Sequence, residues 1–77
     1  MSYWEKIRDI MQKDPSRMWS AAQLAKVIEP DAPAWRRYSV RSNVANALKR
    51  AEKYGLVQIV GLIKEKNHNM ANGWMLA

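Results

Sequence analysis

The chain has 77 residues, 48% of them apolar, with a formal net charge of +6, one histidine and no cysteine. This length predicts one domain, residues 1–77, near the lower size limit at which a hydrophobic core alone supports folding. The lack of cysteine excludes disulfides and thiolate chemistry, and no apolar run approaches the roughly 20 residues of a membrane span. One histidine and seven scattered carboxylates form no nucleophile–base pair or metal cluster. We therefore expect no enzyme activity, no cofactor, no metal and no membrane partner.

In chain order, the first two elements are helices with capping motifs. A Ser-x-x-Glu capping box begins at Ser2, and apolar residues then recur at helical spacing until Pro15 interrupts the pattern. This predicts a helix over about 3–13, and we expect the N-terminal segment to be a helix start and not a signal peptide. A Ser-x-x-Gln box at Ser20 predicts a second helix over about 21–28.

The third predicted helix covers about 40–54, with Ser39 as its N-cap. Its apolar positions fall on one face, and Gly55 stands where a left-handed residue ends many helices. The preceding connection, residues 29–38, contains two prolines and is predicted to be irregular over 29–34. We expect Trp35 to anchor this connection to the core, and contact with nucleic acid is the alternative.

The last third of the chain predicts a β-hairpin. Residues 56–63 are rich in β-branched side chains, 64–72 are polar, and 73–76 form a plausible return strand. Met18 and Trp19, in the link between the first two helices, could pair briefly at the edge of this sheet.

Positive charge is concentrated in one segment. Residues 1–35 carry five basic and five acidic residues, whereas 36–53 carry six basic residues against Glu52, a net charge of +5; 54–77 add +1. An excess of this kind on one element is typical of a surface that binds a phosphate backbone. With a pI of about 10.0, it indicates a cytoplasmic, nucleoid-associated protein.

This layout resembles the winged helix-turn-helix family. Trp19–Ala25 looks like the opening of that family's second helix, and Ala47–Leu56 looks like the end of its third helix. The resemblance implies an α+β fold of three helices and a C-terminal hairpin, called the wing. It also implies that the third helix enters the DNA major groove while the wing lies along the backbone or minor groove. The connection over 29–38 is longer than the tight turn of the simplest members.

Candidate contact residues lie on the face of the third helix opposite Val44 and Ala51. Asparagine can bond adenine with two hydrogen bonds, and the N-terminal part of a recognition helix commonly contacts bases. The predicted base-contacting residues are Ser42, Asn43 and Asn46. The predicted phosphate-contacting residues are Arg36, Arg37, Ser39, Arg41, Lys49, Arg50, Lys53, Lys64 and Lys66, while His68 is predicted to be an exposed wing residue.

The function predicted from these residues is sequence-specific binding of double-stranded DNA, as a transcriptional regulator. The alternatives are a winged-helix protein–protein interaction module and an accessory factor of replication or excision. A single module buries roughly 600–1,000 Å² on DNA, so useful specificity needs a homodimer, tandem sites or a protein partner. Stacking of single-stranded bases would need exposed aromatic side chains, for which only Trp35 and Tyr38 are candidates.

Overall fold

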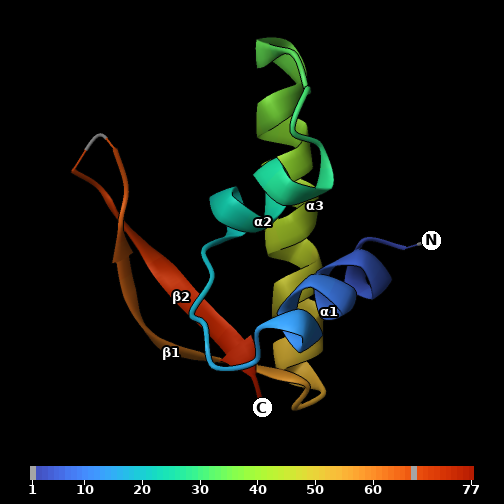
Figure 1. Ribbon diagram of the computed structural model, residues 1–77, viewed down its shortest axis with the longest axis vertical. Helices are drawn as coiled ribbons and strands as arrows, with labels where there is room; N and C mark the ends of the chain where they lie inside the picture. The colour runs from blue at the N-terminus through green and yellow to red at the C-terminus, as the bar shows by residue number, and fades with distance from the viewer. Residues whose placement is uncertain (1, 67) are drawn as a thin grey trace.

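The computed structural model describes residues 2–66 and 68–77; Met1 and Asn67, the latter in the predicted hairpin tip, lie outside the described residues. The fold is α+β, with three helices followed by a two-stranded antiparallel hairpin, and it is compatible with a winged helix (Figure 1). The elements are α1 (Tyr3–Lys13), α2 (Ala21–Ile28), α3 (Ala34–Lys53), β1 (Val57–Lys64) and β2 (Met70–Leu76). The order of elements and the first two helices are confirmed.

The capping motifs explain where the first two helices begin. The backbone N–H of Gln23 donates to Ser20 Oγ at 3.1 Å, and the backbone N–H of Ser20 donates to Gln23 Oε1 at 3.2 Å. This reciprocal box is buried at Ser20, where water cannot compete. At Ser2 the hydroxyl accepts from the Glu5 N–H, and Glu5 Oε1 accepts from the same hydroxyl. Both serines therefore cap their helices, as predicted.

The start of α3 differs from the prediction. The helix begins at Ala34 and not at residue 40, so Ser39 lies inside it and the N-cap is Pro33. Pro33 is extended, with a φ of −65°, and its carbonyl accepts from the N–H groups of Arg36 and Arg37 at 2.9 and 3.1 Å. The proline therefore ends the irregular connection and starts the helix, because its fixed φ suits a helix entrance. No proline or glycine follows within Ala34–Lys53 to interrupt the helix.

The C-terminal end of α3 confirms the predicted boundary. Gly55 has a φ of +74°, its N–H donates to Glu52 O, and the Leu56 N–H donates to Ala51 O, both at 2.9 Å. These two bonds form a Schellman motif, which needs a left-handed residue at the glycine position. The turn directs the chain from α3 into β1.

The hairpin is longer than predicted. β2 begins at Met70 and not at residue 73, because Ile63 pairs with Ala71 and Leu62 with Asn72 across the sheet. The tip is closed by a bond from the Glu65 N–H to Asn69 O at 2.8 Å, next to His68, which has a positive φ of 64°. Some of the polar residues that were predicted to form the tip, such as Lys64 and Asn72, therefore lie in the paired strands. A two-stranded sheet can carry polar side chains there because one of its faces is open to water.

The link before α2 joins the same sheet. Trp19 forms a bridge with Trp74, through N–H to O bonds of 2.9 and 2.7 Å in the two directions. This confirms the predicted pairing near Met18 and Trp19. Met18 lies against Gly61 and Gly73, which face each other across the two strands. Because each glycine carries only a hydrogen in place of a side chain, there is space for the Met18 side chain.

The core lies among the three helices and the base of the hairpin. Trp19 and Trp74 are buried, and Trp4 packs against the core at its edge. Trp35 is 79% exposed, so the expectation that it anchors a loop is wrong. The reason is the earlier helix start, which turns Trp35 away from the core. The main buried residues are Ile7, Met11, Trp19, Leu24, Val40, Val44, Leu48, Ala51, Val57 and Trp74.

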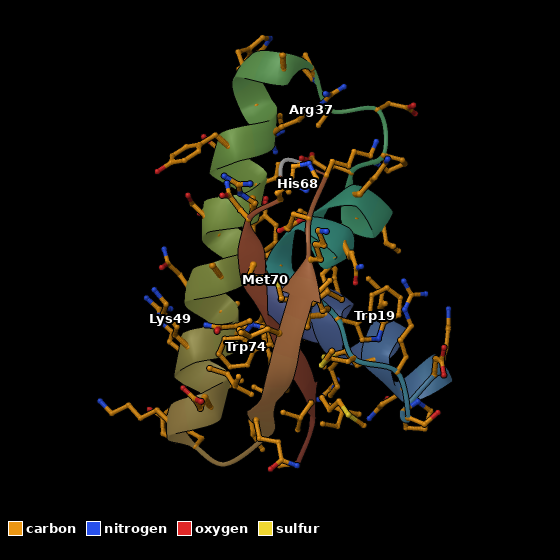
Figure 2. All side chains as sticks on the ribbon, turned by 90° about the vertical axis from the view of Figure 1, so that its left-hand side faces the viewer. Trp19, Arg37, Lys49, His68, Met70 and Trp74 are labelled. Carbon is orange, nitrogen blue, oxygen red and sulfur yellow. The ribbon has the colours of Figure 1, made fainter. Side chains whose placement is uncertain are left out.

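The arrangement leaves one side of α3 uncovered. The helix runs along the length of the molecule, and its N-terminal turns extend beyond α2, at the top of Figure 1. α1 and α2 pack on the same long helix, while the hairpin leaves its C-terminal end and stands away from it on one side. Lys49 lies on the side of α3 remote from α2 (Figure 2).

Candidate nucleic-acid interface

The uncovered side of α3 follows from its residue spacing. Val40, Val44 and Leu48 are fully or almost fully buried and define the direction of the core. At about 100° per residue, the opposite direction is occupied by a second set of side chains. We call this set the outer stripe: Trp35, Tyr38, Ser39, Ser42, Asn46, Lys49 and Lys53. All are exposed except Ser42, which is half-buried.

The lysines of the outer stripe are free to bind an anion. Within residues 2–66 and 68–77 the one ion pair joins Arg36 to Glu29, so Lys49 and Lys53 have no carboxylate partner. Arg41 and Arg50 are also exposed and flank the stripe on its two sides. Because unpaired cations on one face add their potentials, this side of α3 carries a positive potential.

The predicted base-contacting residues do not all lie on the outer stripe. Ser42 and Asn46 belong to the outer stripe, beside Lys49. Asn43 is exposed but is turned toward α1, and with Asn46 and Arg50 it lines a shallow hollow against the start of α1. Because α3 begins at Ala34, all three polar residues lie near its middle and not near its N-terminus.

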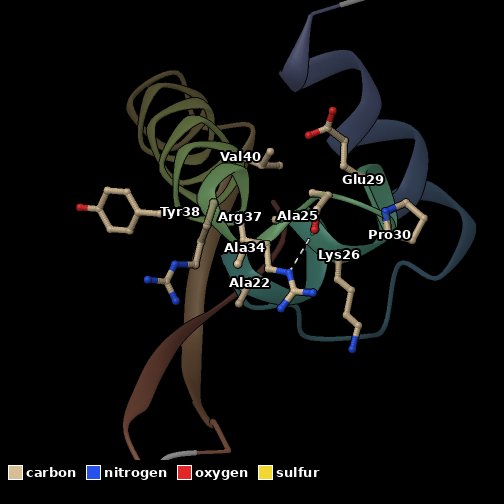
Figure 3. Close-up of a pocket in the computed structure, with 11 residues that line it drawn as sticks. Ala22, Ala25, Lys26, Glu29, Pro30, Ala34, Arg37, Tyr38 and Val40 are labelled. Atoms are coloured by element: carbon tan, nitrogen blue, oxygen red, sulfur yellow. Dashed lines mark hydrogen bonds between the residues drawn. The ribbon is translucent and has the colours of Figure 1, made fainter.

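The two arginines of the first turn leave the helix in other directions. Arg36 donates to both carboxylate oxygens of Glu29, from Nε at 2.9 Å and from Nη2 at 3.0 Å. The hydrogen bond and charge of Glu29 raise the pKa of Arg36. Arg37 Nε donates to Ala32 O at 3.2 Å, over the α2–α3 connection (Figure 3). Neither arginine lies on the outer stripe. Both were predicted to contact phosphate from the connection over 29–38, before a helix expected to start at residue 40.

A second basic surface lies between the hairpin tip and the helices. Lys64 and Lys66, both exposed, line a hollow of about 550 Å³ together with Arg41 and Lys26; Glu65 is the acidic residue in its wall. Lys26 was not among the predicted contacts. It sits in a segment without excess charge, and it lines the same hollow as the other three cations only through the tertiary arrangement of α2 and the hairpin.

The described part of the chain offers little to other kinds of chemistry. No three His, Cys, Asp or Glu side chains there converge as a metal site would require. Nor does any helix among the described residues have the length and apolar character needed to cross a membrane. Comparison with protein-family models and with curated proteins found no match.

Proposed function

We propose that the protein binds double-stranded DNA in a sequence-specific manner, as a winged-helix transcriptional regulator of the cytoplasmic nucleoid. The observation that carries this proposal is the outer stripe of α3. There Lys49 and Lys53 are exposed and unpaired beside Ser42 and Asn46. Cations hold phosphates without regard to sequence, and an amide or hydroxyl distinguishes base edges, so the stripe combines both requirements.

In the proposed complex, the middle of α3 enters the major groove. An α3 of 20 residues is about 30 Å long, whereas the groove is about 12 Å wide, so only part of the helix fits. Ser42 and Asn46 face base edges, and Lys49 and Lys53 reach the flanking phosphates. The hairpin acts as the wing, with Lys64 and Lys66 on the backbone beside the groove. Regulation follows from occupancy of the site.

Selection of bound duplexes from a random pool tests this function. We expect an enriched motif, whose symmetry also reports whether one copy or two bind. Asn46→Ala should then weaken binding to the selected site by about 1–3 kcal/mol more than binding to random DNA. Asn43→Ala is the matched control. It removes the same amide group one turn away, from a side chain that is turned toward α1. Equal losses on both DNAs for Asn46→Ala, or a pool without enrichment, would contradict sequence-specific binding.

A protein–protein interaction module is the second candidate. It is favoured by a hollow of about 450 Å³ between α2 and the first turns of α3 (Figure 3). Small side chains such as Ala22 and Ala25 line it, together with three cations, Lys26, Arg37 and Arg41, against the single carboxylate of Glu29. An acidic segment of another protein would fit this surface. Binding to duplex DNA that weakens by orders of magnitude between about 50 and 200 mM salt would favour the DNA-binding function over this one.

A further inference from the structure

Two exposed aromatic side chains at the beginning of α3 are not used by the fold. Trp35 is 79% exposed and Tyr38 is 71% exposed. The other tryptophans differ, since Trp19 and Trp74 are buried and Trp4 packs against the core. Large aromatic rings contribute strongly to stability and binding when covered, so two of them in open water on one turn indicate a ligand and not a packing role.

The two rings lie at one end of the outer stripe. Trp35 and Tyr38 are three residues apart, about 4.5 Å along the axis and about 60° around it. Trp35 points within about 40° of Ser42, Lys49 and Lys53 on the helix. The Tyr38 ring extends away from α2 (Figure 3) and has the Arg41 guanidinium 5.9 Å from its centroid. The aromatic pair therefore continues the stripe of cations.

A straight helix cannot keep all of this stripe in one groove. Along the axis, Trp35 lies about 16 Å from Asn46, which exceeds the groove width of about 12 Å. With the middle of α3 in the groove, Tyr38 lies at the level of the adjacent backbone and Trp35 lies at or beyond it. Paired bases cannot be reached from there, whereas bases of an unpaired strand can lie flat on the rings.

The surroundings of the rings favour nucleobases over a protein partner. The exposed residues beside them include the cationic Arg37 and Arg41 and the polar Ser39, and the exposed apolar neighbours are only the small Pro33 and Ala34, so the two rings supply the large apolar side chains of this turn. A protein-docking patch normally joins several apolar side chains into one area. Flat rings interspersed with cations are the combination that binds single-stranded nucleic acid, through base stacking and backbone attraction.

We propose that Trp35 and Tyr38 form a stacking platform for unpaired bases next to the duplex that the rest of the outer stripe contacts. The preferred ligand is then duplex DNA with a single-stranded extension, as at a fork, and not uninterrupted duplex. This inference rests on the proposed function, because the duplex contact positions the platform.

Two synthetic DNAs test the inference: a blunt 20-base-pair duplex and the same duplex with six unpaired thymines at one end. Fluorescence anisotropy should show tighter binding of the extended DNA, by roughly 5- to 150-fold, the effect of one base–aromatic stack. Trp35→Ala with Tyr38→Ala should remove this gain, so that the double variant binds the extended DNA no more tightly than the blunt duplex. Tyr54→Ala, at the other end of α3, is the matched control, since Tyr54 is 77% exposed and lies off the outer stripe; it should keep the gain.

Tryptophan fluorescence supplies a second signal. Stacking should quench the emission of Trp35 on the extended DNA, and Trp35→Phe should abolish this quenching while the ring keeps its stack and its affinity. No gain from the extension, or a gain that survives the double variant, would overturn the platform while leaving duplex binding intact. Absence of binding to the blunt duplex would instead contradict the proposed function.

Discussion

Replacement of Lys49 and Lys53 by alanine removes two cations from the outer stripe without disturbing the core, because both side chains are exposed. With Arg36 and Arg37 directed elsewhere, six exposed cations remain from the predicted phosphate contacts: Arg41, Lys49, Arg50, Lys53, Lys64 and Lys66. Each phosphate contact adds about 0.9 to the slope of log affinity against log salt. Six contacts therefore predict a loss of about 10³-fold in affinity between 50 and 200 mM salt, and four contacts predict about 10²-fold.

Anisotropy titrations of a labelled duplex at 50, 100 and 200 mM salt measure this difference. The double variant should bind more weakly at 50 mM, with a slope reduced by about 1.8. Its matched control is Arg8→Ala with Lys13→Ala, which removes the same charge from exposed positions on α1. The control should keep the slope of the unchanged protein. Equal slopes for the two double variants would refute the reasoning, since binding would then follow net charge and not the face of α3.

Three further predictions concern the scaffold that positions this face. Gly73→Ala should destabilise the fold by about 1–3 kcal/mol, because the added Cβ would overlap the Met18 side chain. In a double-mutant cycle measured by thermal unfolding, Met18→Ala should reduce this penalty. Strictly additive effects of the two substitutions on the free energy of unfolding would contradict the contact. Ser20→Ala should cost about 1 kcal/mol, or roughly 4–8 °C in Tm, through loss of the cap of α2; an unchanged Tm would argue against it. His68→Gly should raise the free energy of unfolding by up to about 1 kcal/mol, since glycine adopts the positive φ at lower cost, and a marked loss of stability would contradict this.

The boundaries that the sequence predicted correctly depend on local interactions. The capping box at Ser20 and the left-handed glycine at Gly55 are closed by hydrogen bonds among residues three to five apart, so short motifs determine them. The start of α3 depended on a choice between two roles for Pro33, which is compatible with a loop and with a helix entrance. The return strand was predicted too short because Asn72 is polar, although its pairing with Leu62 across the sheet keeps it in the strand.

The part of the outer stripe over 42–53 could be predicted from helical periodicity alone, since Ser42, Asn46 and Lys49 keep their relative directions wherever the helix begins. The roles of Arg36 and Arg37 could not, because their directions depend on the helix start. Lys26 lines the hairpin-side hollow only because the tertiary structure places α2 and the hairpin around it. The exposure of Trp35 likewise depends on the additional N-terminal turns of α3. These turns were not predicted, because the two prolines before them indicated an irregular connection.

The most direct test of the central claim is NMR mapping of backbone amides while duplex DNA is added to the protein. We predict that the largest shifts occur over 42–53 in α3 and over 62–70 in the hairpin, and that amides over 7–13 in α1 stay unchanged. Shifts concentrated on α1, or no shifts at a DNA concentration well above that of the protein, would contradict the proposed DNA-binding face.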